Sequence, residues 1–431
     1  MKKFVQFFLM FFFTAFCGIS KAQNFNLTFG FNLTYPGQNL SNIWGYVDGA
    51  GNEYALVGAA NGLSIVNVTN PLAPFQVAQI PGPNCIWREI KTIGNYAYIT
   101  SECGTSGLQI VNLSNLPTAT FPTANWSPVI LSTPLETIHA LDTEGSRLYL
   151  YGSNVGLGGV VIGDVTSDPM APVYMGNYND SYVHDGEVRG DTCYCGHIGE
   201  GYFSVMDVSN PVSPTILQTQ ITPGAFTHNT WTSSDGNYLY TTDEVTNSYL
   251  TSYDISNISN ITELDRVQVT PGSGSIIHNT YTINVAGNDY EVVSWYKDGI
   301  AIVDAGRPQN LVVVATYDTY TAGSGNGFAG AWGVYPYLPS GNIVVSNIGE
   351  GLFILTPTYV RACYLEGNVM DSLCGTPLNG VTVSIVSTTA ADNTNLSGNY
   401  ATGYHLPGTY SVTFSKAGYN TKTVTGVNLS A

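Results

Sequence analysis

Four of the six histidines occupy matching places in a repeated pattern, and three of them are followed by Asp or Asn. They are His139, His184-Asp185, His228-Asn229 and His278-Asn279, and successive histidines are 45, 44 and 50 residues apart. Neutral imidazoles close to carboxylates are good ligands for transition metals, so these four histidines are candidate metal ligands. Repeats also duplicate structural residues, and a hydrogen bond that ties neighbouring units together is the alternative role for each histidine.

The elements that must position these histidines are short strands, because one alternating motif recurs seven times. Alternation of apolar and polar residues over short runs is typical of half-buried strands. Repeats of about 40–50 residues with about four strands each predict the blades of a β-propeller. The seven copies begin at Gly62 (GLSIVNV), Gly107 (GLQIVNL), Gly159 (GVVIGDV), Tyr202 (YFSVMDV), Tyr249 (YLTSYDI), Gly299 (GIAIVDA) and Gly351 (GLFILTP).

A second series of residues has the same period and lies 18–21 residues before each motif. We expect the first strand of each unit to begin at this series, and the motif to be the third strand. In a propeller, the first strand of each blade lines the central channel. The series should therefore surround the channel mouth, and its members are Trp44, Trp87, His139, His184, His228, His278 and Trp332.

The last unit lacks a fourth strand after Pro357, and the N-terminus is expected to supply it. The segment FNLTYPG (Phe31–Gly37) is similar to the fourth-strand endings QITPG (Gln220–Gly224) and QVTPG (Gln268–Gly272). Such a closure would remove the exposed edges of the ring. The predicted fold is thus all-β, with residues 24–357 forming a seven-bladed propeller.

The loops before the motifs should reach the same face as the histidines and add charged groups there. Those loops contain Glu102, His197, Glu200, Asp243-Glu244, Lys297-Asp298 and Glu350. The candidate ligand-binding residues of this face are Trp44, Trp87, Arg88, Glu89, His139, His184, Asp185, His228, Asn229, Asp243, Glu244, His278, Asn279 and Trp332.

Two chemistries fit such a face. A mouth rimmed by Trp and acids suits a sugar or a peptide, whereas a histidine-bound metal could activate water in a hydrolase or lyase, with Glu89 or Glu244 as base. The sequence contains neither a G-x-S-x-G nor an H-E-x-x-H motif, which argues against the commonest hydrolase classes. The binding role is therefore the first hypothesis, the metal enzyme is the second, and a purely structural part of an extracellular assembly is the third.

The N-terminus predicts export. Lys2 and Lys3 precede the apolar run Phe4–Phe16, and Ser20-Lys21-Ala22 offers small residues for cleavage, so residues 1–22 read as a signal peptide. Its removal takes away three of the 13 basic residues and no acidic one, which leaves 10 basic against 30 acidic residues. This balance disfavours nucleic acid as a partner. Loop oxygens in such an acidic chain could also bind Ca²⁺. We expect a secreted or cell-surface protein without a transmembrane segment.

Six cysteines remain after this processing, and an oxidising compartment favours disulfides. Cys85 and Cys103 lie at one end of the same unit and are expected to pair, and Cys363 and Cys374 form a second predicted pair. Cys193 and Cys195 share a face of one strand, where a bridge would be strained. Together with His197 they form C-x-C-x-H, which is either a metal site or, as we expect, a pair of buried thiols.

The region from Cys363 resembles the carboxypeptidase regulatory-like domain, a small transthyretin-like β-sandwich. The resemblance rests on short segments in the family's order and implies a spacer or binding module in residues 363–431, without peptidase activity. The segments are Gly367-Asn368-Val369, Gly375–Val381 (GTPLNGV), Gly398-Asn399-Tyr400, Pro407–Tyr410 (PGTY) and Ala417-Gly418-Tyr419.

The repeated part of the chain resembles the choice-of-anchor B family of exported proteins with LVIVD repeats. GLSIVNVTNP, YFSVMDVSNP and GIAIVDA are similar to the core of that repeat. The segments VHDGEVRGD (Val183–Asp191), THNTWTSSDGNYLYTTDE (Thr227–Glu244) and IIHNTYT (Ile276–Thr282) are similar to the family's most recognisable stretches. The resemblance implies a secreted or surface propeller of Bacteroidetes-like bacteria and does not supply an activity.

Overall fold

The computed structural model describes residues 24–431, so the expected signal peptide lies outside the described residues. Within that range the chain is all-β, and its one helical element is the 3-10 turn η1 (Ile258–Asn260). None of the helices in this part of the chain has the length and apolar character needed to cross a membrane.

Most of the chain folds into four-stranded antiparallel sheets, each made of strands that follow one another in sequence. The first three sheets are β2 (Leu40–Val47), β3 (Glu53–Ala59), β4 (Gly62–Asn67) and β5 (Phe75–Pro81); β6 (Ile90–Ile93), β7 (Tyr96–Ile99), β8 (Leu108–Asn112) and β9 (Thr123–Trp126); and β12 (Ala140–Glu144), β13 (Arg147–Tyr151), β14 (Val160–Asp164) and β15 (Val173–Tyr178). A small hairpin, β10 (Val129–Ile130) and β11 (Thr133–Pro134), lies between the second and the third sheet in sequence.

Three further sheets of the same form follow. They are β16 (Asp185–Arg189), β17 (Thr192–His197), β18 (Tyr202–Asp207) and β19 (Thr215–Ile221); β20 (Thr227–Thr232), β21 (Tyr238–Asp243), β22 (Leu250–Asp254) and β23 (Thr262–Val267); and β24 (Thr280–Val285), β25 (Asn288–Ser294), β26 (Ile300–Asp304) and β27 (Val312–Tyr317).

The next sheet joins the two ends of this region. It contains β28 (Ala331–Tyr335), β29 (Ile343–Asn347) and β30 (Gly351–Pro357), and its outer strand is the N-terminal β1 (Leu27–Leu33). Leu27 pairs with Pro357 and Leu33 with Leu352, so the last motif strand takes its partner from the start of the chain. This strand begins four residues earlier than the segment expected from the sequence.

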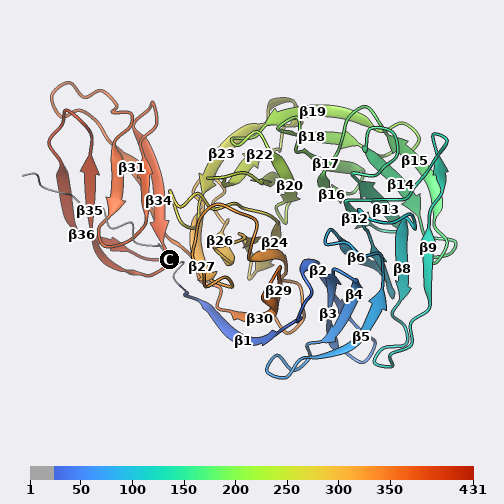
Figure 1. The fold of residues 1–431 in the computed structure, drawn as a ribbon. Helices are drawn as coiled ribbons and strands as arrows, with labels where there is room; N and C mark the ends of the chain where they lie inside the picture. Colours follow the sequence, from blue (N-terminus) through green and yellow to red (C-terminus); the bar gives the residue numbers. More distant parts are fainter. Residues whose placement is uncertain (1–23) are drawn as a thin grey trace, which may run out of the picture.

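The sheets stand around a common centre, with the first strand of each sheet innermost (Figure 1). The inner strands β2, β6, β12, β16, β20, β24 and β28 contact one another in this order, and β28 also contacts β2. The ring is therefore closed. Apolar side chains fill the space between neighbouring sheets, as Ile110 of β8 and Leu150 of β13 do in one buried cluster.

Most copies of the motif begin with glycine, and the backbone conformation at this position explains why. Gly62 and Gly299 have φ values of 137° and 77°, which side chains with a Cβ rarely adopt. A Cβ at Gly299 would also clash with the backbone oxygen of Tyr317 on the neighbouring strand. The motif therefore needs glycine where the preceding loop turns tightly into the strand.

The C-terminal residues form two smaller sheets, which pack beside the ring (Figure 1). One pairs β31 (Cys363–Asn368) with β34 (Asn399–Tyr404), and the other contains β33 (Ala391–Asn393), β32 (Thr382–Ile385), β35 (Gly408–Ser415) and β36 (Lys422–Leu429). Arg307 forms an ion pair of 3.1 Å with Glu366, and the rings of Phe25 and His405 stack at 4.0 Å. These contacts fix this part against the β24–β27 sheet.

The cysteine predictions have different outcomes. Cys85 and Cys103 form the expected disulfide, with a Cα–Cα distance of 5.6 Å. The pairing of Cys363 with Cys374 is wrong, because both are free, Cys363 buried and Cys374 exposed. Cys363 opens β31, and Cys374 lies in the turn beyond its other end. Strand β31 advances about 3.3 Å per residue, so it carries the chain much further than the ~7 Å that a disulfide spans.

Candidate functional site

The candidate site lies at one mouth of the central channel, where each inner strand begins. In four inner strands the residue after the mouth position donates its backbone N–H to a Thr or Ser hydroxyl of the next strand, which identifies Arg88, His228, His278 and Trp332 as corresponding residues. His139 and His184 continue this series through contacts between their rings and the ring of His228. Ser41 precedes Asn42, whose side chain bonds to Glu89, the residue after Arg88. These residues, here called the mouth ring, are Ser41, Arg88, His139, His184, His228, His278 and Trp332.

Aromatic rings follow one another around most of the mouth ring. Ring centroids are 4.0 Å apart for His139 and His184, 4.5 Å for His184 and His228, and 4.2 Å for His228 and His278. Trp332 follows at 4.8 Å from His278. Each of the four histidines is therefore in contact with the next, and all four lie together, as their spacing in the sequence predicted.

A carboxylate stands at each end of the histidine series. Nδ1 of His139 lies 2.5 Å from Oε1 of Glu102. At the other end, Oε2 of Glu244 lies 4.0 Å from Nε2 of His228, and its Oε1 lies 3.8 Å from Nε2 of His278. Both carboxylates come from the loops that precede a motif strand, which agrees with the sequence expectation that those loops supply acids to this face.

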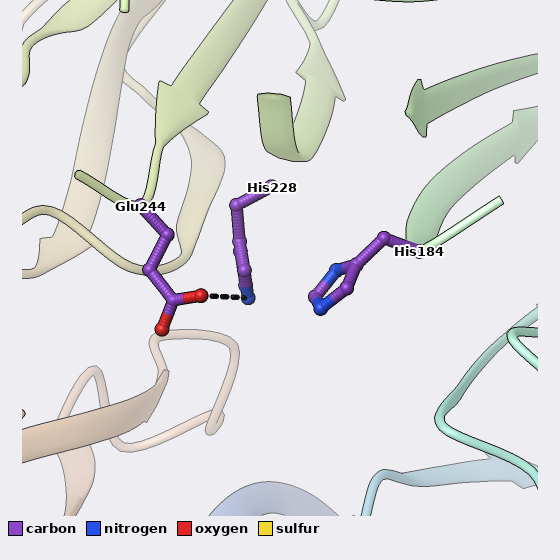
Figure 2. Close-up of side chains that lie close together, drawn as sticks. All are labelled: His184, His228 and Glu244. Atoms are coloured by element: carbon purple, nitrogen blue, oxygen red, sulfur yellow. Dashed lines mark ion pairs between the residues drawn. The ribbon is translucent and has the colours of Figure 1, made fainter. Parts of the chain in front are cut away.

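Three of these side chains could hold a metal ion together. One ligand atom from each of His184, His228 and Glu244 can be chosen so that all three lie within 4.8 Å of one another. In Figure 2 the ring of His228 stands between the carboxylate of Glu244 and the ring of His184. We call these three residues the metal triad.

The histidine nitrogens face two different sides. Nε2 of His228 and Nε2 of His278 lie 4.0 and 3.8 Å from the carboxylate oxygens of Glu244. Nδ1 of His278 donates to the backbone oxygen of Trp332 at 2.7 Å, and a hydrogen bond to the backbone of the next histidine also acts on His184 and on His228. Nε2 of His228 is therefore the nitrogen that faces the other ligands of the triad.

The protonation states also suit a metal. Burial, together with the neighbouring histidines, keeps the pKa of His184 and of His228 well below the usual value. Both imidazoles are thus neutral at neutral pH, which is the form that binds metals. For His139, burial lowers the pKa, but the hydrogen bond and charge of Glu102 outweigh burial and raise it. His139 is therefore the histidine of this series that most readily carries a proton.

The space inside the mouth ring is small. A cavity of about 20 Å³ lies there, lined by His139, His228, His278 and the carboxylates Glu89 and Asp185, among others. A water needs about 10–15 Å³ by this kind of measure. The cavity therefore admits one water or one ion, but not a sugar ring.

Trp44 does not belong to the mouth. It lies within β2, packs against Tyr335 with ring centroids 4.8 Å apart, and lines a different cavity towards the far end of the channel. Its place at the mouth is taken by Ser41, which sits in a bulge of the β2–β3 pairing between Leu40 and Ile43. The sequence expectation for Trp44 was wrong because it placed the mouth residue 18 residues before Gly62, whereas the spacing of 21 residues that His228 and His278 have leads to Ser41.

Trp87 reaches the mouth from one position before the ring residue of its strand. Its ring stacks on Trp332 at 4.9 Å and is 37% exposed. The ring residue itself, Arg88, is buried and donates from Nε to the backbone oxygen of Ala59 at 2.9 Å. Glu89 faces the channel and forms an ion pair of 2.9 Å with Lys91.

The remaining candidates lie close to the site but have structural partners. Asn229 donates to Asp185 Oδ2 at 2.9 Å, one layer further into the channel than the histidines. Asn279 lies in the same layer, and its Oδ1 is buried without a partner in the described structure. Asp243 accepts the backbone N–H groups of Gly224 and Phe226, so it fixes a loop and does not face the mouth.

Tyr296 is the residue of this site that the sequence reasoning missed. Its hydroxyl donates to Oε1 of Glu244 at 2.5 Å. The sequence contains a signal for this role. Tyr296 directly precedes Lys297-Asp298 in the loop before a motif strand, and its place in the repeat is the one that Glu244 has in the preceding repeat.

The C-x-C-x-H segment does not form a metal site in the described structure. His197 uses both ring nitrogens, since Nε2 lies 2.8 Å from Ser204 Oγ and Nδ1 lies 2.8 Å from the backbone oxygen of Tyr182. Cys193 and Cys195 are buried free thiols with their sulfurs 3.1 Å apart.

Comparison with known proteins identifies two kinds of unit in the chain. Residues 87–121, 185–222 and 233–269 match the LVIVD repeat, and residues 364–431 match the carboxypeptidase regulatory-like domain. A search of curated proteins finds no match. The chain therefore contains LVIVD repeats, within which the triad residue Glu244 lies, followed by a carboxypeptidase regulatory-like domain.

Proposed function

We propose that the protein is an exported, seven-bladed β-propeller of the choice-of-anchor B family. Its parts would be a signal peptide in residues 1–22, the propeller in residues 24–357 and a β-sandwich in residues 363–431. Support comes from the seven four-stranded sheets between residues 27 and 357, whose inner strands contact one another in a closed order. The protein would act at the cell surface or outside the cell.

The function that the geometry supports best is binding of a divalent transition-metal ion by His184, His228 and Glu244. The observation that carries this proposal is the approach of three ligand atoms to within 4.8 Å of one another. Two imidazoles and one carboxylate suit zinc or a similar transition metal better than Ca²⁺, which prefers six to eight oxygen ligands. Of the two kinds of divalent metal considered from the sequence, a transition metal is therefore the better candidate.

A glycan, peptide or protein ligand would then bind outside the mouth ring. The cavity inside the ring is too small for such a ligand, at about 20 Å³. The 37% exposed ring of Trp87 offers a flat apolar surface beside the mouth. In this proposal the metal stabilises the mouth, and the rim contacts the partner.

A metal-dependent hydrolase or lyase is the second candidate. The observation in its favour is that the triad supplies three protein ligands. Three protein ligands leave a position for water, as in catalytic zinc sites. A metal bound there would lower the pKa of that water towards neutrality. Glu244 would then be a ligand rather than the base, and Glu89 is engaged by Lys91.

The experiment is elemental analysis of the protein purified without a histidine tag, loaded with Zn²⁺ and dialysed. We expect about one metal ion per chain. His228→Ala should lose it, whereas His405→Ala, in the C-terminal sandwich, should retain it. The proposal is wrong if the wild-type protein holds no stoichiometric metal, or if His228→Ala holds as much. A metal-dependent reaction that His228→Ala abolishes would favour the enzyme over the binding role.

A further inference from the structure

A second cavity opens at the other end of the channel, on the same inner strands. Its volume is about 340 Å³. Glu187 and Arg189 line it, and they follow His184 by three and five residues along β16. At about 3.3 Å per residue, the cavity begins roughly 10 Å from the histidines. We call it the lower cavity; its lining shares no residue with the metal triad.

Aromatic rings form one wall of the lower cavity. Trp44, Trp231 and Tyr337 line it. Trp231 packs edge to face on Tyr281 at 4.7 Å, and the hydroxyl of Tyr337 donates to the backbone oxygen of Thr282 at 2.9 Å. These contacts hold the rings in place before any ligand arrives.

Carboxylates form another part of the lining. Asp142 and Glu187 are 5% and 8% exposed, and Glu144 lies at the opening. Oδ2 of Asp142 accepts the backbone N–H of Val188 at 2.7 Å, and Glu187 accepts the N–H of Thr232 at 2.5 Å. Each carboxylate is thus fixed by the backbone and retains capacity to accept further bonds.

The nearby cations already have partners. Lys91 pairs with Glu89 at 2.9 Å and lies over the ring of Trp44, 4.2 Å from its centroid. Arg189 donates to the backbone oxygens of Ser233 and Ser234 at 2.5 and 2.6 Å. The lining of the cavity contains three carboxylates, Asp142, Glu144 and Glu187, and one cation, Arg189.

Lys91 also demonstrates how this part of the channel holds a cation. Its ammonium group combines a carboxylate with the faces of Trp44, Tyr281 and Trp231, at 4.2, 5.4 and 5.9 Å from the ring centroids. Aromatic faces attract ammonium ions through their negative quadrupole. The lower cavity repeats this combination of carboxylates and aromatic rings in a space of small-molecule size.

We propose that the lower cavity binds a small organic ammonium ion, with Asp142 and Glu187 as its counter-charges and Trp231 as its aromatic wall. Burial and the charge of Asp142 outweigh the charge of Arg189 and raise the pKa of Glu187 to about 8, so this one nearby cation does not balance an ionised Glu187. A ligand ammonium supplies that balance. The hydroxyl of Thr282 and the backbone around Ser233 provide further polar contacts at the cavity wall.

The test is calorimetric titration with diprotonated 1,4-diaminobutane, in 0.15 M NaCl at pH 8 so that general attraction to this acidic chain is screened. The neutral isostere 1,4-butanediol and glucose serve as comparison probes. We expect saturable binding of the diamine alone. Glu187→Gln, which keeps an oxygen for the Thr232 N–H, should weaken binding at least tenfold. Glu263→Gln, at an exposed acid remote from the cavity, should leave it unchanged.

Two further variants separate a loss of ligand binding from a loss of folding and from the metal site. If Glu187→Gln fails to fold, Trp231→Phe provides the second test and should also weaken binding. His228→Ala should bind the diamine normally, so failure of the metal proposal does not affect this one. The inference is overturned if the diamine does not bind at millimolar concentration, if glucose or the diol binds as well, or if binding survives both cavity variants.

Discussion

The hydroxyl of Tyr296 donates a 2.5 Å hydrogen bond to Oε1 of Glu244, and Glu244 in turn lies 4.0 Å from His228. The tyrosine comes from the loop before β26, and the glutamate follows β21. The contact therefore joins two neighbouring sheets and orients the carboxylate towards the histidines. Groups that orient a metal ligand in this way commonly change metal affinity by about 10–100-fold.

Tyr296→Phe is expected to lower zinc affinity about 10–100-fold while the fold is retained, because the ring still packs on Trp332 and only the hydroxyl is lost. Competition with a chromophoric chelator measures the affinity. Tyr359→Phe is the matched control, since the Tyr359 hydroxyl is buried without a partner in the described structure. Equal affinity in both variants would show that Tyr296 does not position Glu244.

The stability of the metal-free protein is expected to fall as pH rises from about 5 to about 8. Burial raises the pKa of Asp142 to about 6 and that of Glu291 to about 8, and burial with the charge of Asp142 raises that of Glu187 to about 8. Each value lies above that of the unfolded chain, near 4, so the stabilisation is complete below about pH 4 and is lost as pH rises through the folded-state values.

Denaturant unfolding with EDTA at pH 5, 6.5 and 8 measures this loss, which should be on the order of a few kcal/mol. The charged groups around these acids include Lys91, Glu89, Arg189 and Asp289. The charge of Glu89 outweighs burial and holds the pKa of Lys91 above its usual value, so Lys91 stays protonated across this window. Glu291→Gln should flatten the pH dependence, because glutamine still accepts a bond from Thr280 or Thr282 without a charge. Stability that is constant or rises with pH would contradict the prediction.

Removal of the disulfide is expected to lower the free energy of unfolding. Cys85 and Cys103 are 18 residues apart, and closing a loop of this size stabilises a protein by about 3 kcal/mol. The double variant Cys85→Ala/Cys103→Ala should show this loss in urea unfolding. Cys374→Ser, at an exposed free cysteine, should stay within about 0.5 kcal/mol of the wild type. An unchanged stability of the double variant would indicate that the bridge does not form.

The four free cysteines within residues 24–431 should differ in reactivity. Of these four, Cys374 is exposed, whereas Cys193, Cys195 and Cys363 are buried. In the native protein a maleimide should modify Cys374 within minutes, and the other three should react after unfolding. Mass spectrometry of the labelled peptides distinguishes these cases. Protection of both Cys374 and Cys363 from labelling in the unfolded, non-reduced protein would instead restore the rejected disulfide.

Much of the fold could be predicted because each repeat carries its own local signals. A glycine such as Gly299 marks the turn into a motif strand, where a Cβ would clash with Tyr317. Alternation of apolar residues marks the strand itself. The pairing of Cys363 with Cys374 failed because proximity in sequence says little when an extended strand lies between two residues. Figure 1 places β1, the first described strand, beside β30 of the last sheet of the ring.

The sequence by itself determined which strands form the channel and that four histidines share one end of it, because both follow from the period of the repeat. Only the tertiary structure decided the depth at which each side chain enters the channel. Ser41 takes the position expected for Trp44, which lines the lower cavity, and Arg88 takes the position expected for Trp87. This depth depends on the register between neighbouring strands. Contacts between strands determine the register, and the alternation of residues within one strand does not. For the same reason, only the folded chain brings Tyr296 to Glu244.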